Sequence, residues 1–303
     1  LFEPAFLEED YDRLRTQTLQ GILNNKKNAG YLASTAYRAL LYGDSIAGLP
    51  GGGNEDTVQN LTLKDVKGFY KTHFKPADAQ LIAVSNLEQG ALIESIKKPL
   101  SAWRGKGKKL KLKLPVPSHD SNTVYLVNKD EAAQSAIRIG KRDIKEDITG
   151  EFYRSGLMNF PLGGHFNSRV NLNLREEKGY TYGAFTGFSG GRLSGNYTAS
   201  ASVRADVTDL SIVEFVEEIN RYHDTGINAD ELAFLRKSIN QQDALKYETP
   251  NAKLGFLAQI LEHDLTPEFV KERSQIVDSI TLEEINQLAK KHLNFADMFI
   301  VIV

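Results

Sequence analysis

Residues 160–183 constrain the fold of this chain more than any other stretch, because they set where two helices end and a strand begins. Two adjacent glycines end the first helix and Gly179 ends the second, since glycine readily adopts the backbone conformation that terminates a helix. Arg175 lies in the last part of the second helix, and Tyr182 lies in the extended segment that follows. The sequence therefore predicts a helix–turn–strand unit that brings Arg175 and Tyr182 together.

The residues after position 120 have the pattern of a complete α+β unit. Apolar side chains alternate over 192–203, which predicts a strand with one buried face. Apolar side chains recur at helical spacing over 210–222, which predicts a helix. By the same patterns, strands are expected at 123–127, 135–139 and 298–303, and helices are expected to begin at 151 and to cover 229–246, 251–262 and 282–292.

The first hundred residues are predicted to be mainly helical. Acidic residues at 8–10 favour the start of a helix, where they complement its dipole. Thr62, followed by Asp65 three residues later, has the spacing of a capping box at the start of another helix. A further helix is expected at 31–41, and a buried strand at 79–84.

Residues 104–120 are predicted to be a linker with an extended arm. Residues 104–119 hold six lysines and arginines together with two glycines and two prolines. Glycine and proline interrupt regular elements, and a run of positive charge is usually solvated. A nucleic-acid site would need interleaved aromatic residues, and only Trp103 is near. We therefore expect domains at 1–103 and 121–303.

Composition excludes several classes of function. The net charge of −2 gives no electrostatic reason to expect a nucleic-acid or membrane partner. No apolar run approaches the roughly 20 residues of a membrane span. Cysteine is absent, so thiolate metal sites are excluded.

Because the chain begins with Leu1, we expect a fragment or processed form.

The six histidines give no sign of a metal site. No two of them lie three to five residues apart, so no helical turn presents two imidazoles on one face. No Gly-x-Ser-x-Gly motif marks a serine nucleophile either. The remaining candidate is the pair Arg175 and Tyr182, since a guanidinium and a phenol can both donate to one carbonyl oxygen. From the residues alone, a surface arginine and a core tyrosine remain the alternative.

The motif at 162–182 resembles a known family signature. It contains Leu-Gly-Gly, then Asn-Ser-Arg, then Leu-Arg-Glu-Glu-Lys-Gly-Tyr-Thr-Tyr, and it resembles the signature of the pitrilysin/insulinase zinc peptidases. Residues 4–15 and 61–77 also resemble helices of that family, so the resemblance covers nearly the whole chain. It implies an α+β, insulinase-type two-lobe fold. Each lobe would be a mostly antiparallel sheet covered by helices on one side, and the first lobe would be incomplete here.

The resemblance also implies how a site is divided between lobes. In the family, the first lobe binds zinc through an HxxEH helix and a further glutamate, and the second lobe contributes an arginine and a tyrosine seven residues later. Arg175 and Tyr182 match that spacing. The HxxEH helix is absent, and Gly21, beside Gln20, stands where the further zinc-binding glutamate is expected. We therefore expect no catalytic residue and no metal ligand in this chain, and zinc only on a partner chain or lobe.

Two functions remain open. In the first, the chain is the non-catalytic, substrate-binding part of a zinc metalloendopeptidase and is inactive alone. A zinc-bearing family subunit or lobe would then be its partner, and the chain would offer the peptide substrate Arg175, Tyr182 and an edge strand. In the second, it is a purely structural relative, like the core proteins of respiratory complexes. A clipped, intact peptidase is a third possibility. Bacterial relatives suggest the periplasm or cell envelope.

Overall fold

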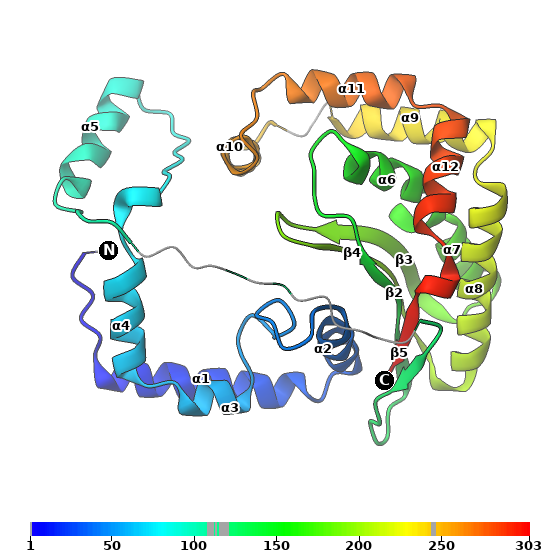
Figure 1. Cartoon of the computed structure of the whole chain (residues 1–303), viewed down its shortest axis with the longest axis horizontal. Helices are drawn as coiled ribbons and strands as arrows, with labels where there is room; N and C mark the ends of the chain where they lie inside the picture. The colour runs from blue at the N-terminus through cyan, green and yellow to red at the C-terminus, as the bar shows by residue number, and fades with distance from the viewer. Residues whose placement is uncertain (1, 108–111, 113, 115–120, 244–246) are drawn as a thin grey trace. The chain divides into compact units, whose positions relative to one another are not determined.

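The structure is a computed structural model that describes residues 2–107, 112, 114, 121–243 and 247–303. The chain forms two compact units (Figure 1). The first comprises Leu1–Asn24, Pro50–Lys113 and Lys246–Glu262, and the second comprises Asn25–Leu49, Leu114–Leu245 and His263–Val303. These units cross the expected boundaries, because residues 25–49 group with the second unit. The division at 103 and 121 stays a prediction, and most of the expected linker lies outside the described residues.

A five-stranded mixed sheet forms the centre of the second unit (Figure 1). Its spatial order is β1-β5-β2-β4-β3. β1 and β5 are parallel, and the other neighbours are antiparallel. The strands are β1 (Val124–Leu126), β2 (Gln134–Asp143), β3 (Thr181–Gly190), β4 (Gly195–Arg204) and β5 (Phe299–Ile302). The four strands predicted after residue 120 are confirmed, and β3 contains the extended segment that carries Tyr182.

Helices cover one face of this sheet and form the main core. Along β4, Tyr197, Ala199, Ala201 and Val203 are buried in that core, which confirms the predicted alternation. Leu193 lies before β4 and is exposed, so the strand is shorter than predicted. The helical segments of this unit that contribute to the core are α6 (Glu151–Asn159), η2 (Phe160–Gly164), α7 (Arg169–Asn171), η3 (Leu172–Glu177), α8 (Thr208–Thr225), α9 (Ala229–Asp243), α11 (Phe269–Ser279) and α12 (Leu282–His292).

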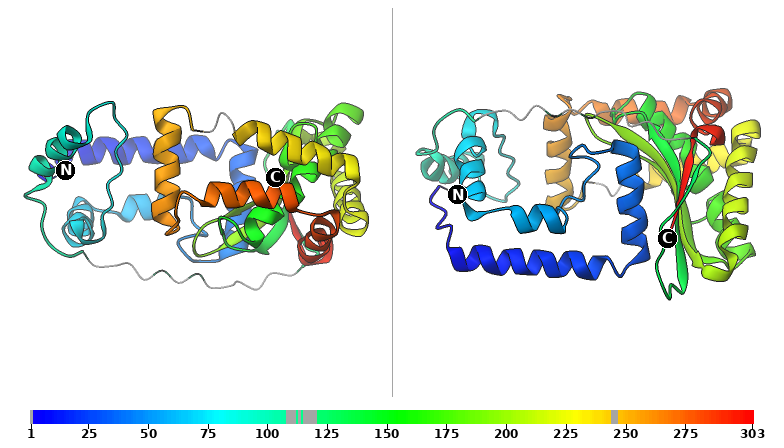
Figure 2. Two further views of the ribbon diagram at one scale, coloured as in Figure 1. Left: turned by 90° about the horizontal axis from the view of Figure 1, so that it is seen from above. Right: turned by 60° about the horizontal axis from the view of Figure 1, so that its bottom comes forward.

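The opposite face of the sheet is covered by α2 (Ala29–Tyr42), which confirms the helix predicted at 31–41, although the sequence did not indicate that it packs on the sheet (Figure 2). Tyr37 and Leu41 pack against Phe299 and Val301 of β5. The Tyr37 hydroxyl donates a hydrogen bond of 2.6 Å to the carbonyl oxygen of Tyr197 in β4. A buried hydroxyl requires such a partner, so this bond sets where α2 meets the sheet.

All regular secondary structure in the described residues of the first unit is helical. Capping boxes at Asn54 and Thr62 begin α3 and α4, because each side chain accepts a hydrogen bond from a free amide of the first turn. The unit contains α1 (Glu8–Asn25), α3 (Glu55–Asn60), α4 (Leu63–His73), η1 (Pro76–Asp78), α5 (Gln89–Leu100) and α10 (Pro250–Glu262). The short helix η5 (Phe295–Asp297) belongs to the second unit and precedes β5.

The strand predicted at 79–84 does not form. These residues have no regular secondary structure, and Leu81 is 62% exposed. A strand is stable only when a neighbouring strand accepts and donates its backbone hydrogen bonds. None of the described residues of the first unit forms such a neighbour. The prediction of a buried strand at 79–84 was therefore wrong.

Membrane insertion through a helix has no support in the described part of the chain. None of its helices combines the length and the apolar character that crossing a bilayer requires.

Gly140 allows the contact between α2 and the sheet, so we expect Gly140→Ala to destabilise the protein. A Cβ at this position would lie 2.0 Å from the Tyr197 carbonyl oxygen and 2.2 Å from the Tyr37 hydroxyl oxygen. Relieving such overlap in a packed region costs about 1–3 kcal/mol. Urea denaturation would show this as a lower midpoint. Gly187→Ala in β3 is the matched control, because a Cβ there meets no atom within 4 Å. Equal midpoints for the two variants would contradict this account.

Candidate functional site

Arg175 is held at the end of the helical segment formed by α7 and η3. Its guanidinium lies over the ring of Phe166, with the guanidinium carbon 4.3 Å from the ring centroid. Its Nε lies 3.4 Å from a carboxylate oxygen of Glu176, and the side chain is partly exposed. The segment ends at Glu177, and Gly179 follows with a φ of 65°, as predicted. The cation is thus supported from one side and remains accessible from the other.

Tyr182 lies at an irregularity near the start of β3. The pairing with β4 shifts between Thr181 and Ala184, which marks a bulge at Tyr182 and Gly183. The Thr181 hydroxyl donates to the carbonyl oxygen of Ser202 at 2.7 Å and accepts from the amide of Gly183 at 3.1 Å. Tyr182 is 90% exposed, so the alternative of a core tyrosine is excluded. A bulge changes the direction of a side chain in this way because it interrupts the regular hydrogen bonds between the two strands.

Asn171 connects the surroundings of these two residues. It is fully buried in α7. Its side-chain oxygen accepts a hydrogen bond of 2.9 Å from the amide of Ala184, directly after the bulge. Its side-chain nitrogen donates to the carbonyl oxygen of Phe166 at 2.6 Å. Sequence reasoning missed Asn171, and its only signal was a polar residue on the buried side of a predicted helix.

Within the described residues, no hydrogen bond joins the Arg175 guanidinium to the Tyr182 hydroxyl. Both side chains end on the surface, and each is held by the elements described above. The structure therefore shows how each donor is supported, while their joint action on one carbonyl oxygen stays a prediction.

The outer edge of β3 is closed at its centre. Asn159 donates to the carbonyl oxygen of Thr186 at 2.8 Å, and the Thr186 hydroxyl donates back to Asn159 at 2.6 Å. Gly163 packs so closely that a Cβ there would lie 2.2 Å from the Thr186 hydroxyl oxygen. With Asn171 bound to the Ala184 amide and Asn159 to the Thr186 carbonyl oxygen, two outward backbone groups at 184–186 already have partners. The expected edge strand for a peptide is therefore not free at these residues of β3.

Arg169, the other arginine of the motif, has a structural role. It makes two hydrogen bonds of 2.7 Å to the carboxylate of Glu231 and one of 3.0 Å to the carbonyl oxygen of Gly226. Burial raises the pKa of Glu231, but the hydrogen bonds and the charge of Arg169, together with the hydrogen bond from the Asn228 amide, outweigh burial and hold that pKa below its ordinary value. Arg169 thus fastens α7 to the connection between α8 and α9.

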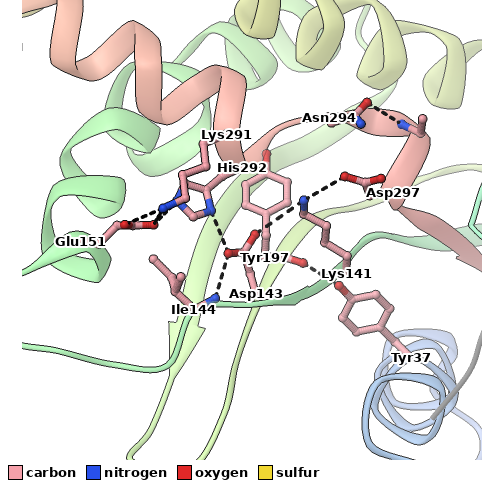
Figure 3. Close-up of polar contacts among 11 residues, drawn as sticks. Tyr37, Lys141, Asp143, Ile144, Glu151, Tyr197, Lys291, His292, Asn294 and Asp297 are labelled. Carbon is pink, nitrogen blue, oxygen red and sulfur yellow. Dashed lines mark hydrogen bonds and ion pairs between the residues drawn. The ribbon is translucent and has the colours of Figure 1, made fainter. Parts of the chain in front are cut away.

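A second polar cluster surrounds His292 at the end of α12 (Figure 3). Its two ring nitrogens lie 2.8 Å from carboxylate oxygens of Asp143 and Glu151. The imidazole ring therefore lies between the two carboxylates and bridges them. The Lys291 ammonium donates to Glu151 at 2.7 Å, and this bond, with a smaller contribution from His292, lowers the pKa of Glu151. The cluster fastens α12 to β2 and α6.

Zinc ligands are not gathered anywhere in the described part of the chain. No group of three or more histidine, aspartate or glutamate side chains there could hold a metal ion. In the His292 cluster, both ring nitrogens are already bound to carboxylates. Gly21 lies within α1, and its neighbour Gln20 offers an amide in place of a carboxylate. The donor set present does not fit the family's zinc site.

The comparisons with known proteins agree on one family. Residues 60–239 match the family described as "Peptidase M16 inactive domain". A Helicobacter pylori protein named non-peptidase homolog YmxG is 20% identical over all of this chain and 69% of its own length. A Bacillus subtilis protein named uncharacterized zinc protease YmxG is 23% identical over 82% of this chain and 60% of its own length. The chain therefore spans about two thirds of these relatives.

Solved structures show the same fold. A crystal structure of a peptidase M16 inactive domain from Pseudomonas fluorescens matches 99% of this chain and 71% of its own, with a TM-score of 0.87 and 21% identity. The periplasmic protease PqqL from Escherichia coli matches 97% of this chain but only 32% of its own, with a TM-score of 0.74 and 15% identity. A chain of complex III from Candida albicans matches 95% of this chain and 70% of its own, with a TM-score of 0.76 and 14% identity.

We expect His292→Leu to lower the free energy of unfolding by about 3 kcal/mol or more, because it leaves the buried carboxylate of Asp143 without its closest side-chain partner. Thermal or urea unfolding followed by circular dichroism would measure the loss. His223→Leu is the control, since His223 bonds only to its exposed neighbour Asp224. A change within about 0.5 kcal/mol is expected there. If His292→Leu is as stable as the wild type, the cluster does not fasten α12.

The purified chain should hold no stoichiometric zinc and should not cleave peptides. The described residues offer no three-ligand group, and Gly21 replaces the expected carboxylate. Elemental analysis after dialysis would measure the metal content. About one zinc per chain, lost on substitution of a histidine, would contradict this prediction.

Proposed function

Because this chain belongs to the peptidase M16 family, matching its inactive domain, we propose that it is the non-catalytic, substrate-binding part of a zinc-dependent metalloendopeptidase. A second subunit or lobe of the same family would hold the zinc and its bound water. This chain would contribute Arg175 and Tyr182, which bind the carbonyl oxygen of the scissile peptide bond.

The exposure of Tyr182 is the observation that carries this proposal. Its side chain is 90% exposed although it lies within a strand next to a packed core. A side chain in that position contributes little to the stability of its own unit. Its hydroxyl is therefore available to a ligand, and the bulge holds its backbone in one conformation.

The chemistry of the two side chains suits a carbonyl that gains charge. When water attacks a peptide carbonyl, negative charge develops on its oxygen. The guanidinium of Arg175 and the hydroxyl of Tyr182 can both donate to that oxygen, and both act more strongly as the charge grows. Interactions that are stronger in the transition state than in the ground state raise turnover. The contact of Arg175 with Phe166 supports this role, because it limits the positions of the guanidinium before substrate binds.

The family relationships support a divided site. The match covers 71% of the Pseudomonas fluorescens chain and 32% of PqqL, so both proteins contain residues with no counterpart in this chain. The first unit also exposes large apolar side chains, among them Leu14, Phe69 and Leu81. If these side chains adjoin one another, they would form the kind of apolar patch that associates with another protein.

A purely structural role is the second candidate. The structural likeness to a chain of complex III and the name of the Helicobacter pylori relative, a non-peptidase homolog, favour it. Under this alternative the same association surface would serve assembly, and Tyr182 would have no effect on any turnover. Substitution of Tyr182 therefore distinguishes the two candidates.

We expect Tyr182→Phe to lower turnover of the complex with a zinc-bearing partner by about 10²–10³-fold, the usual loss when one such donor is removed. Phenylalanine keeps the ring and deletes only the hydroxyl, so the thermal unfolding temperature should not change. Arg175→Lys should also reduce turnover, because an ammonium on a flexible stem does not reproduce the planar guanidinium. Peptide cleavage under saturating substrate would measure both effects.

Tyr180→Phe is the control, because Tyr180 precedes the bulge and its hydroxyl is not assigned to the carbonyl. Its turnover should equal that of the wild type. Normal turnover with Tyr182→Phe, or no activity with any zinc-bearing family partner, would favour the structural candidate.

A further inference from the structure

We propose that the side-chain amide of Asn171 is the positioning element that holds Arg175 and Tyr182 in register with each other. This inference rests on the proposed function, since it concerns the same pair. The two side chains come from different elements, a helical segment and a bulged strand. Asn171 is the buried residue that hydrogen-bonds to the supports of both.

The first branch of hydrogen bonds from Asn171 leads to Arg175. The nitrogen of the Asn171 amide donates to the carbonyl oxygen of Phe166 at 2.6 Å and so fixes the backbone of that residue. The Phe166 ring is 54% exposed and is not held in place by core packing. It lies under the Arg175 guanidinium at 4.3 Å. A change in the backbone of Phe166 would therefore move the surface on which the guanidinium rests.

The second branch leads to Tyr182. The oxygen of the Asn171 amide accepts from Ala184, the residue at which regular pairing with β4 resumes. The bulge consists of the residues between Thr181 and Ala184, so Asn171 fixes its far end while the Thr181 hydroxyl fixes its near end. A Cβ on Gly183 would lie 3.8 Å from the same oxygen of Asn171, which places the bulge directly beside this amide. The bulge that carries Tyr182 is thus held at both of its ends.

Only a side chain with both a donor and an acceptor can serve both branches. The neighbours of the amide, an N–H on one side and a carbonyl oxygen on the other, require this orientation of its oxygen and nitrogen. In its ionised form, at a pH above its pKa in this buried position, aspartate would keep the acceptor for Ala184 and lose the donor for Phe166. Its carboxylate would then lie against a carbonyl oxygen, which repels it. Asn171→Asp therefore separates the Arg175 branch from the Tyr182 branch.

Asn159 provides a matched control. It is also buried, and its amide also bridges two groups next to β3, since it donates to the Thr186 carbonyl oxygen and accepts from the Thr186 hydroxyl. It makes no hydrogen bond to Phe166 or to the bulge. Asn159→Asp introduces the same chemical change into the same interior without touching either branch.

The test has one readout that needs no partner. The nuclear magnetic resonance signal of the Arg175 Nε–H group should carry an upfield ring-current shift from Phe166 in the wild type. We expect Asn171→Asp to lose this shift and to keep the slow exchange of the Ala184 amide, because the acceptor is retained. Asn159→Asp should keep the Arg175 shift. An unchanged Arg175 signal in Asn171→Asp, or an equal loss in both variants, would overturn the inference.

The second readout is turnover of the complex with the zinc-bearing partner. Misplacement of one donor should lower kcat of Asn171→Asp by about 10²-fold with a smaller change in KM. Asn159→Asp should stay within about twofold of the wild type, even if both variants lose the same thermal stability. Equal kcat values for the two variants would overturn the positioning role. If the Arg175 signal moves as expected but Tyr182→Phe has normal turnover, the proposed function fails and the positioning role stands.

Discussion

The close approach of residues 160–177 to the edge of β3 is the contact that brings the helical segments of the second unit against its sheet. Gly163 makes it possible, because any side chain there would overlap Thr186. The approach leaves outward backbone groups of β3 needing partners, and the amides of Asn159 and Asn171 supply them. The edge is thereby protected from pairing with another chain. The same contact carries the helical segment with Arg175 past the bulge that exposes Tyr182.

The buried polar side chains of the second unit mostly fasten elements to one another. Tyr37 joins α2 to β4, Arg169 joins α7 to the end of α8, and His292 joins α12 to β2 and α6. Each has its hydrogen-bond partners inside the unit, as buried polar groups require. Tyr182 differs from all of them, since it lies beside this framework and contributes almost nothing to it. A rigid framework that presents one unburied phenol is a suitable arrangement for binding a ligand group.

Arg175 and Tyr182 lie within the residues that match the peptidase M16 inactive domain. Gly21 and Gln20 remove the expected carboxylate, and the described residues gather no other ligand group. The Arg/Tyr pair is retained at the spacing that the family signature predicts. Both candidate functions require a partner, and they differ in whether the pair contacts a substrate. The exposed apolar surface of the first unit gives a physical reason for the partner in either case.

Local sequence patterns determined most helices and strands of the second unit, though not α11, and they determined the glycine that ends η3 and Arg175 and Tyr182 as candidates. These are properties of short stretches, in which spacing alone decides which face is apolar and where a helix stops. Contacts between distant residues decided the rest. The strand expected at 79–84 found no neighbour, and α2 covered the second face of the sheet by packing on β5. Asn171 gained its role only because Phe166 and Ala184 meet its two amide atoms. The sequence by itself thus chose the two donors, whereas tertiary structure alone decided that Tyr182 faces solvent and what holds it there, because hydrogen bonds and burial depend on which segments come together in space.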